Sequence, residues 1–552
     1  MAKQKQIKEN SGGHSTRGIL ASLVAVLSVA MNVYAGSLTS PTHTPRLLLC
    51  ISVDQLRSDL LIGFSPLYSQ EGWRRILSGG AVYPSVDFDV YPLDVASAIA
   101  SIYTGEYPSM HGIGASLVYD EETNKCSSVV EDSNYMGNYT SERYSPLALQ
   151  MSTIGDELKY ASAGRSSVYS IAPNPEEAIL AGGQEADAAY WIENDKGRWA
   201  TSTYYTKQLP WFVEKANSTP NNIGALLSGK TWKNSRKVEG QLLPYTGTFA
   251  PFYHKIGESV EQYKKTPLVN DDVTNLAISF VEHYGYELGT SPHMLSVVYT
   301  AAPYPGAMDY EQGAEMQDAY VRLDSNIARL LNAVERKIGL SNCLVMLSGT
   351  GYSSYRQPPV RSANGKRSTR NFSPERCKAL LNMYLMAVYG QGQWIKSYRN
   401  NYIYLNRSLV EERKLSLEEV QIKAAQFTSE MAGVASCIPV LSRKSYIGIE
   451  QSLANGIHKQ EKADLILQIL PGWYVEPNII DIRDTSLQGK YRKMPCDSPV
   501  IFFGWGIKAA IYADEKPSVR RIAPSLAHVL RIRPPCNRDI PLPAITGRLL
   551  SK

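Results

Sequence analysis

The chain has 552 residues, 43% of them hydrophobic and 20% charged, which is the composition of an ordinary soluble globular protein and excludes a disordered, collagen-like or coiled-coil chain. The formal net charge is only +5, and part of it lies near the N-terminus, where Lys3, Lys5, Lys8 and Arg17 outnumber Glu9. A chain so close to neutral gives no electrostatic reason to expect a nucleic-acid partner.

The N-terminus has the features of an export signal. A basic, polar start ends at Arg17, and an uncharged, mostly apolar run follows it and ends in Val33-Tyr34-Ala35, with small residues where a signal peptidase reads. We therefore expect residues 1–35 to be a cleaved signal peptide and the mature protein to be periplasmic or secreted, without a transmembrane segment. An uncleaved inner-membrane anchor stays open, because the run is nearly long enough to span a bilayer.

The seven cysteines leave at least one thiol without a disulfide partner in an exported protein. Cys50 and Cys343 lie inside apolar segments, which predicts buried hydrophobic roles for them. The chain has no Cys-x-x-Cys pair, so zinc-finger and thioredoxin chemistry is not supported.

Short apolar runs suited to strands buried on both faces recur along the chain and alternate with amphipathic helices. Strands are predicted at 46–53, 166–172, 293–300, 343–348 and 500–503, and helices at 272–284, 311–337 and 416–432. This alternation predicts an α/β protein with a mostly parallel sheet. Asp54 follows the first strand, which is where α/β proteins place ligand chemistry.

Two regions depart from the alternating pattern. Residues 191–267 are rich in Tyr, Trp, Pro, Gly and Asn, which predicts a cap-like insertion, and residues 394–472 form a second mixed insertion. The main domain is expected to cover 36–552. Tyrosines of the cap could stack on a sugar or a peptide, or they could be ordinary side chains of strands and loops without a ligand-binding role.

Several segments resemble the alkaline phosphatase superfamily, most closely its PafA-type phosphatases and nucleotide pyrophosphatase/phosphodiesterases. Ser52-Val-Asp-Gln-Leu-Arg57 resembles the opening metal-binding strand of that superfamily, and Ile102-Tyr-Thr-Gly105 resembles the stretch after its nucleophile. Further similar segments are Tyr107-Pro108, 111–113, 153–158, 186–191, 320–324 and 522–525. The resemblance runs from about residue 46 to about residue 547 and implies an alkaline-phosphatase-like sandwich, with helices on both faces of the sheet.

The resemblance also implies two zinc ions, which would clamp a phosphate and activate a hydroxyl nucleophile. Zinc requires several converging Asp and His side chains. At the nucleophile position, counted from Pro92 to the Tyr-Thr-Gly segment, stands Val95, which has no atom able to attack phosphorus. Asp94 and Ser97 lie on either side of Val95. Either residue could stand at the nucleophile position only if the sequence were aligned to the family in a different register.

The expected metal-binding positions have lost most of their ligands. Asp54 matches the first ligand, but Pro303 and Ala307 stand at the next Asp and His positions, and Thr350 and Gly351 stand at another Asp-His pair. Asp497 lies nearest the last histidine position. The eight histidines give an independent check, because the chain contains no Asp-His dipeptide, no His-x-His, and no Asp or His four residues before another His.

The phosphate-binding positions are altered as well. Pro173 and Pro175 occupy the place of a Lys-x-Arg pair, and Ser116 that of an asparagine donor. Glu176 and Glu177 stand where positive charge is expected, and two acids beside a phosphate dianion would repel it.

We therefore expect an exported, catalytically degenerate protein that binds or scaffolds in the cell envelope, with no zinc and no other cofactor. Its partner would be an unknown envelope protein or a small polar ligand. The candidate pocket residues are Asp54, Ser116, Tyr304, Thr350, Tyr352 and Asp497. A zinc-dependent phosphomonoesterase or phosphodiesterase stays open as the alternative, and metal-free chemistry through Ser97 or Cys496 as a third. His111 is expected to be structural, as is Cys496 if it is buried or bridged.

Overall fold

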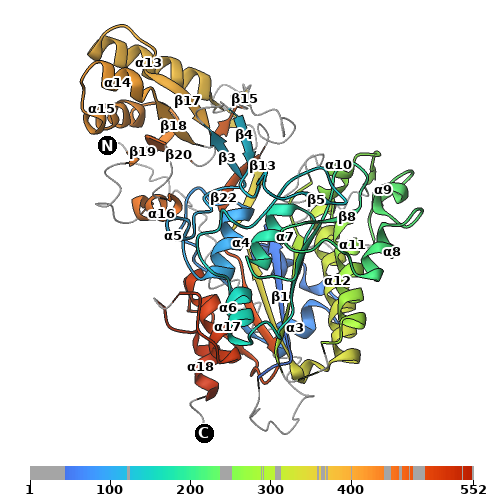
Figure 1. Ribbon diagram of the computed structural model, residues 1–552. Coiled ribbons are helices and arrows are strands. Elements are labelled where there is room, and N and C mark those ends of the chain that lie inside the picture. Colours follow the sequence, from blue (N-terminus) through green and yellow to red (C-terminus); the bar gives the residue numbers. More distant parts are fainter. Residues whose placement is uncertain are drawn as a thin grey trace, which may run out of the picture. The chain divides into compact units, whose positions relative to one another are not determined.

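The computed structural model in Figure 1 describes most of the chain from residue 44 to residue 549. It leaves out 1–43, 121–124, 236–251, 287–288, 290, 305–312, 357–359, 362–366, 369–370, 400, 441–448, 459–462, 471–472, 477–490, 537–538 and 550–552. The predicted signal peptide and Ala307 therefore lie outside the described residues.

A mixed, mostly parallel sheet forms the centre of the protein. Within the described chain it has ten strands in the order β24-β2-β23-β12-β1-β11-β6-β7-β8-β5. The strands are β1 Leu47–Asp54, β2 Ala81–Tyr83, β5 Gly137–Asn138, β6 Val168–Ile171, β7 Ala188–Ile192, β8 Trp199–Ser202, β11 His293–Thr300, β12 Cys343–Gly349, β23 Val500–Gly504 and β24 Ala510–Ile511. The predicted fold class is confirmed.

All eight residues of strand β1 are buried, because the strand lies between two parallel neighbouring strands and has a layer of helices on each face of the sheet. It pairs with β11 from Leu47 opposite His293 to Asp54 opposite Thr300. Consecutive side chains of a strand point to opposite faces. A strand of this kind is therefore expected to be mostly apolar, and in the run Leu-Leu-Leu-Cys-Ile-Ser-Val only Ser52 is a polar residue.

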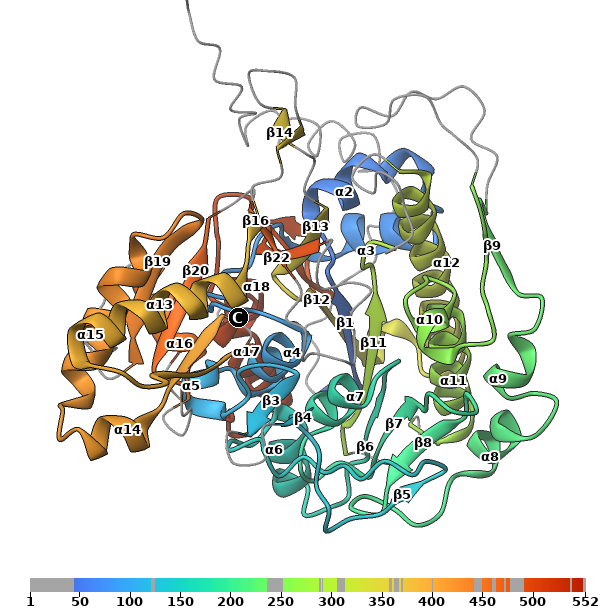
Figure 2. The same ribbon diagram turned by 90° about the horizontal axis from the view of Figure 1, so that it is seen from above.

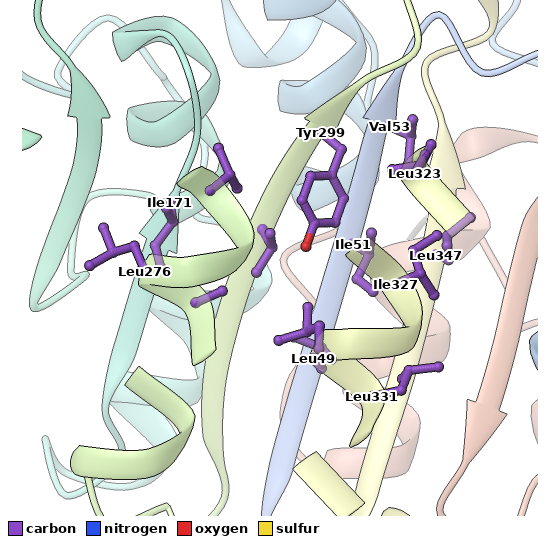
Figure 3. Packing of buried hydrophobic residues seen from close by; sticks show 14 of the residues in the cluster. Leu49, Ile51, Val53, Ile171, Leu276, Tyr299, Leu323, Ile327, Leu331 and Leu347 are labelled. Carbon is purple, nitrogen blue, oxygen red and sulfur yellow. The ribbon is translucent and has the colours of Figure 1, made fainter. Parts of the chain in front are cut away.

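Helices cover both faces of the sheet (Figures 1 and 2). One face packs against α3 Trp73–Gly79, α11 Val269–His283 and α12 Ala314–Lys337. The other packs against α4 Val95–Thr104, α6 Ile154–Ala161, α7 Pro175–Gly182, α17 Ile522–Leu530 and α18 Pro543–Leu549. Figure 3 shows the first layer, where Ile51 and Leu49 of β1 lie beside Ile327 and Leu331 of α12.

The predicted strands and helices are found with shifts of a few residues at their ends. The sequence did not predict that β23 runs antiparallel to β12. It also missed β8, because the segment Trp-Ala-Thr-Ser has no continuous apolar run, although all four residues are buried. The direction of a strand, and the formation of a short strand of mixed polarity, depend on the neighbouring strands. A local sequence pattern contains no information about those neighbours.

The predicted cap-like segment 191–267 begins inside the central sheet, since it contains the end of β7 and all of β8. Its described remainder consists of α8 Trp211–Asn217, α9 Ile223–Leu226, β9 Thr231–Lys233, β10 Tyr253–Lys255 and α10 Val260–Lys264. The limits of the insertion stay a prediction.

The segment 394–472 contains a second sheet, here called the small sheet, with the order β17-β18-β20-β19. Its strands are β17 Ile395–Arg399, β18 Tyr402–Leu405, β19 Val434–Pro439 and β20 Leu465–Ile469. One face packs against α13 Pro374–Tyr389, α14 Arg407–Glu412 and α15 Leu417–Ser429. Helix α13 lies before the predicted boundary at residue 394.

Short elements complete the described fold. They are α2 Ser58–Gly63, α5 Pro108–His111, α16 Ile449–Gly456, the 3-10 turns Ser65–Leu67, Leu340–Asn342 and Val519–Arg521, and the strands β3 Leu117–Asp120, β4 Lys125–Ser128, β13 Tyr352–Arg356, β14 Val360–Arg361, β15 Arg367–Ser368, β16 Asn371–Phe372, β21 Tyr474–Val475 and β22 Tyr491–Pro495. None of the helices in the described ranges is long and apolar enough to cross a membrane.

The packing of β1 predicts a strong stability effect at Ile51, whose side chain is fully buried. Ile51→Ala should lower the free energy of unfolding by about 2–5 kcal/mol, because it leaves a cavity between β1 and α12. Leu226→Ala, at a residue that is 53% exposed, should cost less than about 0.5 kcal/mol. Urea unfolding of both variants checks this, and equal midpoints would contradict the assigned core.

Candidate functional site

Asp54 lies at the carboxyl end of β1, and its carboxylate already has protein donors. Oδ1 accepts hydrogen bonds from Tyr352 Oη at 2.7 Å and from Thr350 Oγ1 at 3.2 Å. Oδ2 accepts one from Gln55 Nε2 at 3.3 Å. Thr350 and Tyr352 follow β12, the parallel neighbour of β1, so the topology brings these three predicted pocket residues together.

The turn after β12 is held in place by further bonds. The backbone N–H of Gln55 donates to Thr350 Oγ1 at 2.8 Å, and Gln55 Oε1 accepts from the N–H of Ser354 at 2.7 Å. Gly351 has φ +76, and a Cβ there would lie 2.1 Å from the ring of Phe88. A side chain at position 351 would therefore collide with the ring of Phe88.

Val95 is the first residue of α4, and Asp94 caps that helix. Asp94 Oδ1 accepts from the N–H of Ser97 at 3.1 Å, and Asp94 Oδ2 accepts from the N–H and Oγ of Ser116 at 2.7 and 2.9 Å. The N-terminus of a helix is a natural position for an anion. Here the Asp94 carboxylate occupies that position, and it also accepts both hydrogen bonds that Ser116 donates.

Several buried carboxyl groups lie near Asp54. Burial raises the pKa of Asp54, and it raises the pKa of Glu177 to about 8, with the charge of Asp54 adding to the effect. Burial likewise raises the pKa of Tyr352, with the charges of Asp54 and Asp94 contributing. Glu177 accepts a hydrogen bond from Asn174 Nδ2 at 2.9 Å. The acids predicted from the sequence thus lie within electrostatic range of one another.

Two lysines partly balance the charge of these acids, and neither was predicted from the sequence. Lys264 of α10 is 8% exposed, and burial lowers its pKa to about 8, against the opposing charges of Glu142 and Glu177. The Nζ of Lys493 in β22 lies 5.6 Å from the centre of the Tyr352 ring. Both residues are hundreds of positions from Asp54 in sequence, and neither belongs to a local motif.

Two predicted pocket residues lie elsewhere. The ring of Tyr304 packs 5.2 Å from Trp232 and 4.7 Å from His254, between ring centres. The side chain of Asp497 is 59% exposed, and it accepts from Ser85 Oγ at 2.6 Å. No described contact brings either residue to Asp54.

The described residues do not fit a two-zinc centre. Among them, no group of three or more His, Cys, Asp or Glu side chains is arranged to hold a metal ion. Pro303 and Thr350 have no charged ligand atom, and Gly351 has no side chain. Asp54, which the sequence analysis predicts to match a family ligand, is hydrogen bonded as described above.

The residues proposed for metal-free chemistry are held in structural roles. Ser97 Oγ takes part in the capping of α4. Burial raises the pKa of Cys496 to about 12, so that this thiol stays protonated near neutral pH. His111 is buried, its Nε2 lies 3.0 Å from Ser101 Oγ, and burial lowers its pKa to about 3. An imidazole in this state supports the helix rather than acting as a base.

Comparisons with known proteins agree with the fold. The family model described as type I phosphodiesterase / nucleotide pyrophosphatase matches residues 48–483. The chain is 26% identical over 564 residues to the alkaline phosphatase PafA of Elizabethkingia meningoseptica, covering 95% of this chain and 99% of that protein. It is 27% identical over 524 residues to a Myroides odoratus protein named calcium-transporting ATPase, covering 89% and 92%.

A solved structure shows the same architecture. The crystal structure of wild-type alkaline phosphatase PafA matches with a TM-score of 0.78 at 23% identity, covering 92% of this chain and all of that one. At this level of identity the likeness establishes the shared fold.

Glu177 predicts a specific pH dependence of stability. Its pKa is raised from an ordinary 4.5 to about 8, so the folded protein keeps a proton that the unfolded chain releases. The stability contributed by this carboxyl is fully present below about pH 4.5 and is lost as the pH rises through about 8. Glu177→Gln should therefore lose less stability than the wild type between pH 5 and pH 8, by an amount on the order of a few kcal/mol.

Urea midpoints measured at both pH values check this prediction. The exposed Glu418→Gln is the matched control and should follow the wild-type curve. Parallel curves for Glu177→Gln and the wild type would show that the Glu177 carboxyl is ionised in the folded protein.

Proposed function

This chain belongs to the type I phosphodiesterase / nucleotide pyrophosphatase family of the alkaline phosphatase superfamily, and we propose that it uses the inherited fold to bind a small polar ligand without hydrolysing phosphate esters. The observation that carries the proposal is the state of Asp54. Its carboxylate accepts hydrogen bonds from Tyr352 and Thr350 at the place where the family resemblance calls for metal ligands.

The chemistry of the nucleophile position supports the same conclusion. Val95 offers only a hydrocarbon side chain, so no covalent phosphoryl intermediate can form there. The N-terminus of α4 is capped by Asp94, so a phosphate oxygen would meet a carboxylate instead of free N–H groups. Glu177 adds another acid within range of Tyr352.

The ligand class follows from the groups that remain. The pocket offers carboxyl groups, hydroxyls and the ammonium of Lys264, which pair with donors and acceptors of a small polar molecule better than with a dianion. We further propose that the protein acts in the cell envelope, after export through residues 1–35, alone or with an envelope protein as partner.

A zinc-dependent phosphomonoesterase or phosphodiesterase is the second candidate. It is favoured by the family itself and by relatives that are named alkaline phosphatases and align with nearly the whole chain. The comparisons support this candidate more than the non-catalytic one, whereas the local chemistry around Asp54 supports the non-catalytic one. The two candidates differ in their metal content.

Zinc content and turnover therefore test the proposal. Mature protein purified with zinc in the growth medium should carry far less than one zinc per chain by mass spectrometry of the metal, and should not hydrolyse p-nitrophenyl phosphate above a buffer blank. About two zinc ions per chain, together with turnover that Asp54→Ala abolishes, would establish the hydrolase instead.

Restoring the nucleophile alone should not restore activity. Val95→Thr adds a hydroxyl at the start of α4, but Gly351 and Pro303 still provide no metal ligand, so p-nitrophenyl phosphate turnover should stay at the blank level. Val95→Ala serves as the matched control for changes at the helix start. A measurable gain in Val95→Thr over Val95→Ala would show that the metal-binding positions are assigned wrongly.

A further inference from the structure

The small sheet has a second face, which differs in character from the face under the helices. Cross-strand pairs place Ser397 opposite Tyr404 and Arg399 opposite Tyr402, and directly opposed residues share a face. We call this the tyrosine face, defined by Ser397, Arg399, Tyr402 and Tyr404. The neighbouring residues Tyr398, Ile403 and Leu405 point the other way and pack with α13 and α15.

Arg399 is the charged residue of this face, at the end of the edge strand β17, and it is only 2% exposed. Its Nη1 donates to the carbonyl of Tyr398 at 2.8 Å. Its Nε is fully buried and has no hydrogen-bond partner among the residues that the structure describes. Within the described parts of the chain, Arg399 forms no ion pair with a carboxylate, so a buried positive charge lacks a counter-charge.

A second buried donor lies on the same face. Ser397 stands two positions before Arg399 in β17 and is 3% exposed, and its Oγ also lacks a hydrogen-bond partner in the described part of the chain. Leaving two polar groups buried and unpaired costs free energy for each of them, more for a charged group. Their occurrence side by side indicates that something other than the chain satisfies them.

The aromatic neighbours of Arg399 hold the guanidinium in place. Its Cζ lies 5.2 Å from the centre of the Tyr119 ring, which itself lies 5.0 Å from the ring of Tyr404. A guanidinium stacked on a tyrosine keeps its plane fixed and its edges available. With Nη1 engaged by a carbonyl, the edge carrying Nε and Nη2 is the one left for a ligand.

We infer that the tyrosine face of the small sheet is a binding site for an oxyanion, a carboxylate or phosphate group of a small molecule, held by the Nε–Nη2 edge of Arg399 and by Ser397. Two parallel N–H donors match two oxygens of such a group. The anion supplies the missing counter-charge, which is why carboxylate and phosphate share this chemistry whereas a neutral sugar does not.

This site is distinct from the Asp54 pocket and does not depend on its function. It lies on a different sheet, and its residues take no part in the hydrogen bonds of Asp54 or Asp94. The two are near in sequence at one point, because Tyr119 of β3 stands three residues after Ser116. Failure of the proposed function at Asp54 would therefore leave the oxyanion site untouched, and the reverse also holds.

Calorimetric titration of the mature full-length chain with sodium phosphate and, separately, with sodium acetate tests the inference. Sodium chloride at matched ionic strength is the reference, and EDTA is present so that a metal-bound phosphate does not contribute. Samples are equilibrated overnight because the site is buried. At least one oxyanion should bind, and which one binds distinguishes a phosphate ligand from a carboxylate ligand.

The variants assign the binding to Arg399. Arg399→Gln should weaken binding by about tenfold or more, because it removes the charge and the paired donors. Arg399→Lys keeps the charge without the planar fork and should weaken it less, as should Ser397→Ala. Lys396→Gln, an equal charge change at an exposed position of the same strand, should bind as the wild type does.

Two results would overturn the inference. One is the absence of any oxyanion binding by the wild type at millimolar concentration. The other is binding by Arg399→Gln as tight as that by the wild type. If Arg399→Gln fails to fold by circular dichroism, Arg399→Lys and Ser397→Ala decide, and unchanged affinity in both rejects the site.

Discussion

The hydrogen bonds on the buried Asp54 carboxylate determine what the central pocket can do. A carboxylate oxygen that already accepts two hydrogen bonds has little lone-pair capacity left for a metal ion. Here Tyr352 donates at 2.7 Å and Thr350 at 3.2 Å to the same oxygen, and the backbone of Gln55 fixes Thr350 in that position. Burial raises the pKa of this acid, while the hydrogen bond from Tyr352 opposes the rise.

The surrounding residues are consistent with this state. Phe88 fills the space that a side chain at position 351 would need. The Asp94 carboxylate accepts hydrogen bonds both from the N-terminus of α4 and from Ser116. The anion position beside Val95 is therefore occupied by a side chain of the protein itself. Each of these contacts is compatible with a well-packed fold. The core beneath, built on β1 and α12, does not depend on any of them.

Much of the fold was predictable from the sequence because continuous apolar runs and helical periodicity are local signals. The apolar runs at β1, β11 and β12 predict buried parallel strands, and the long amphipathic stretch predicts helix α12. The antiparallel direction of β23 and the short strand β8 were not predictable, since both depend on the neighbours they pair with. The small sheet was recognised only as a mixed segment, because its two faces differ and its strands are short.

The site was predictable in part. Asp54, Thr350 and Tyr352 were named from motif positions, and parallel pairing of β1 with β12 brings them together. Tyr304 and Asp497 were named in the same way but lie elsewhere, because a motif position does not determine where a replaced side chain points. Lys264 and Lys493 carry no local signal at all. Arg399 also carries no local sequence signal. It attracts attention only in the structure, because among the described residues its buried guanidinium has no carboxylate partner.

Zinc-edge anomalous diffraction from crystals soaked in zinc would test the central claim most directly. We expect no anomalous peak within coordination distance of Asp54, with the Tyr352 hydroxyl still bonded to its carboxylate. A peak on that carboxylate, with Tyr352 displaced from it, would show that the pocket still holds metal and would contradict the account.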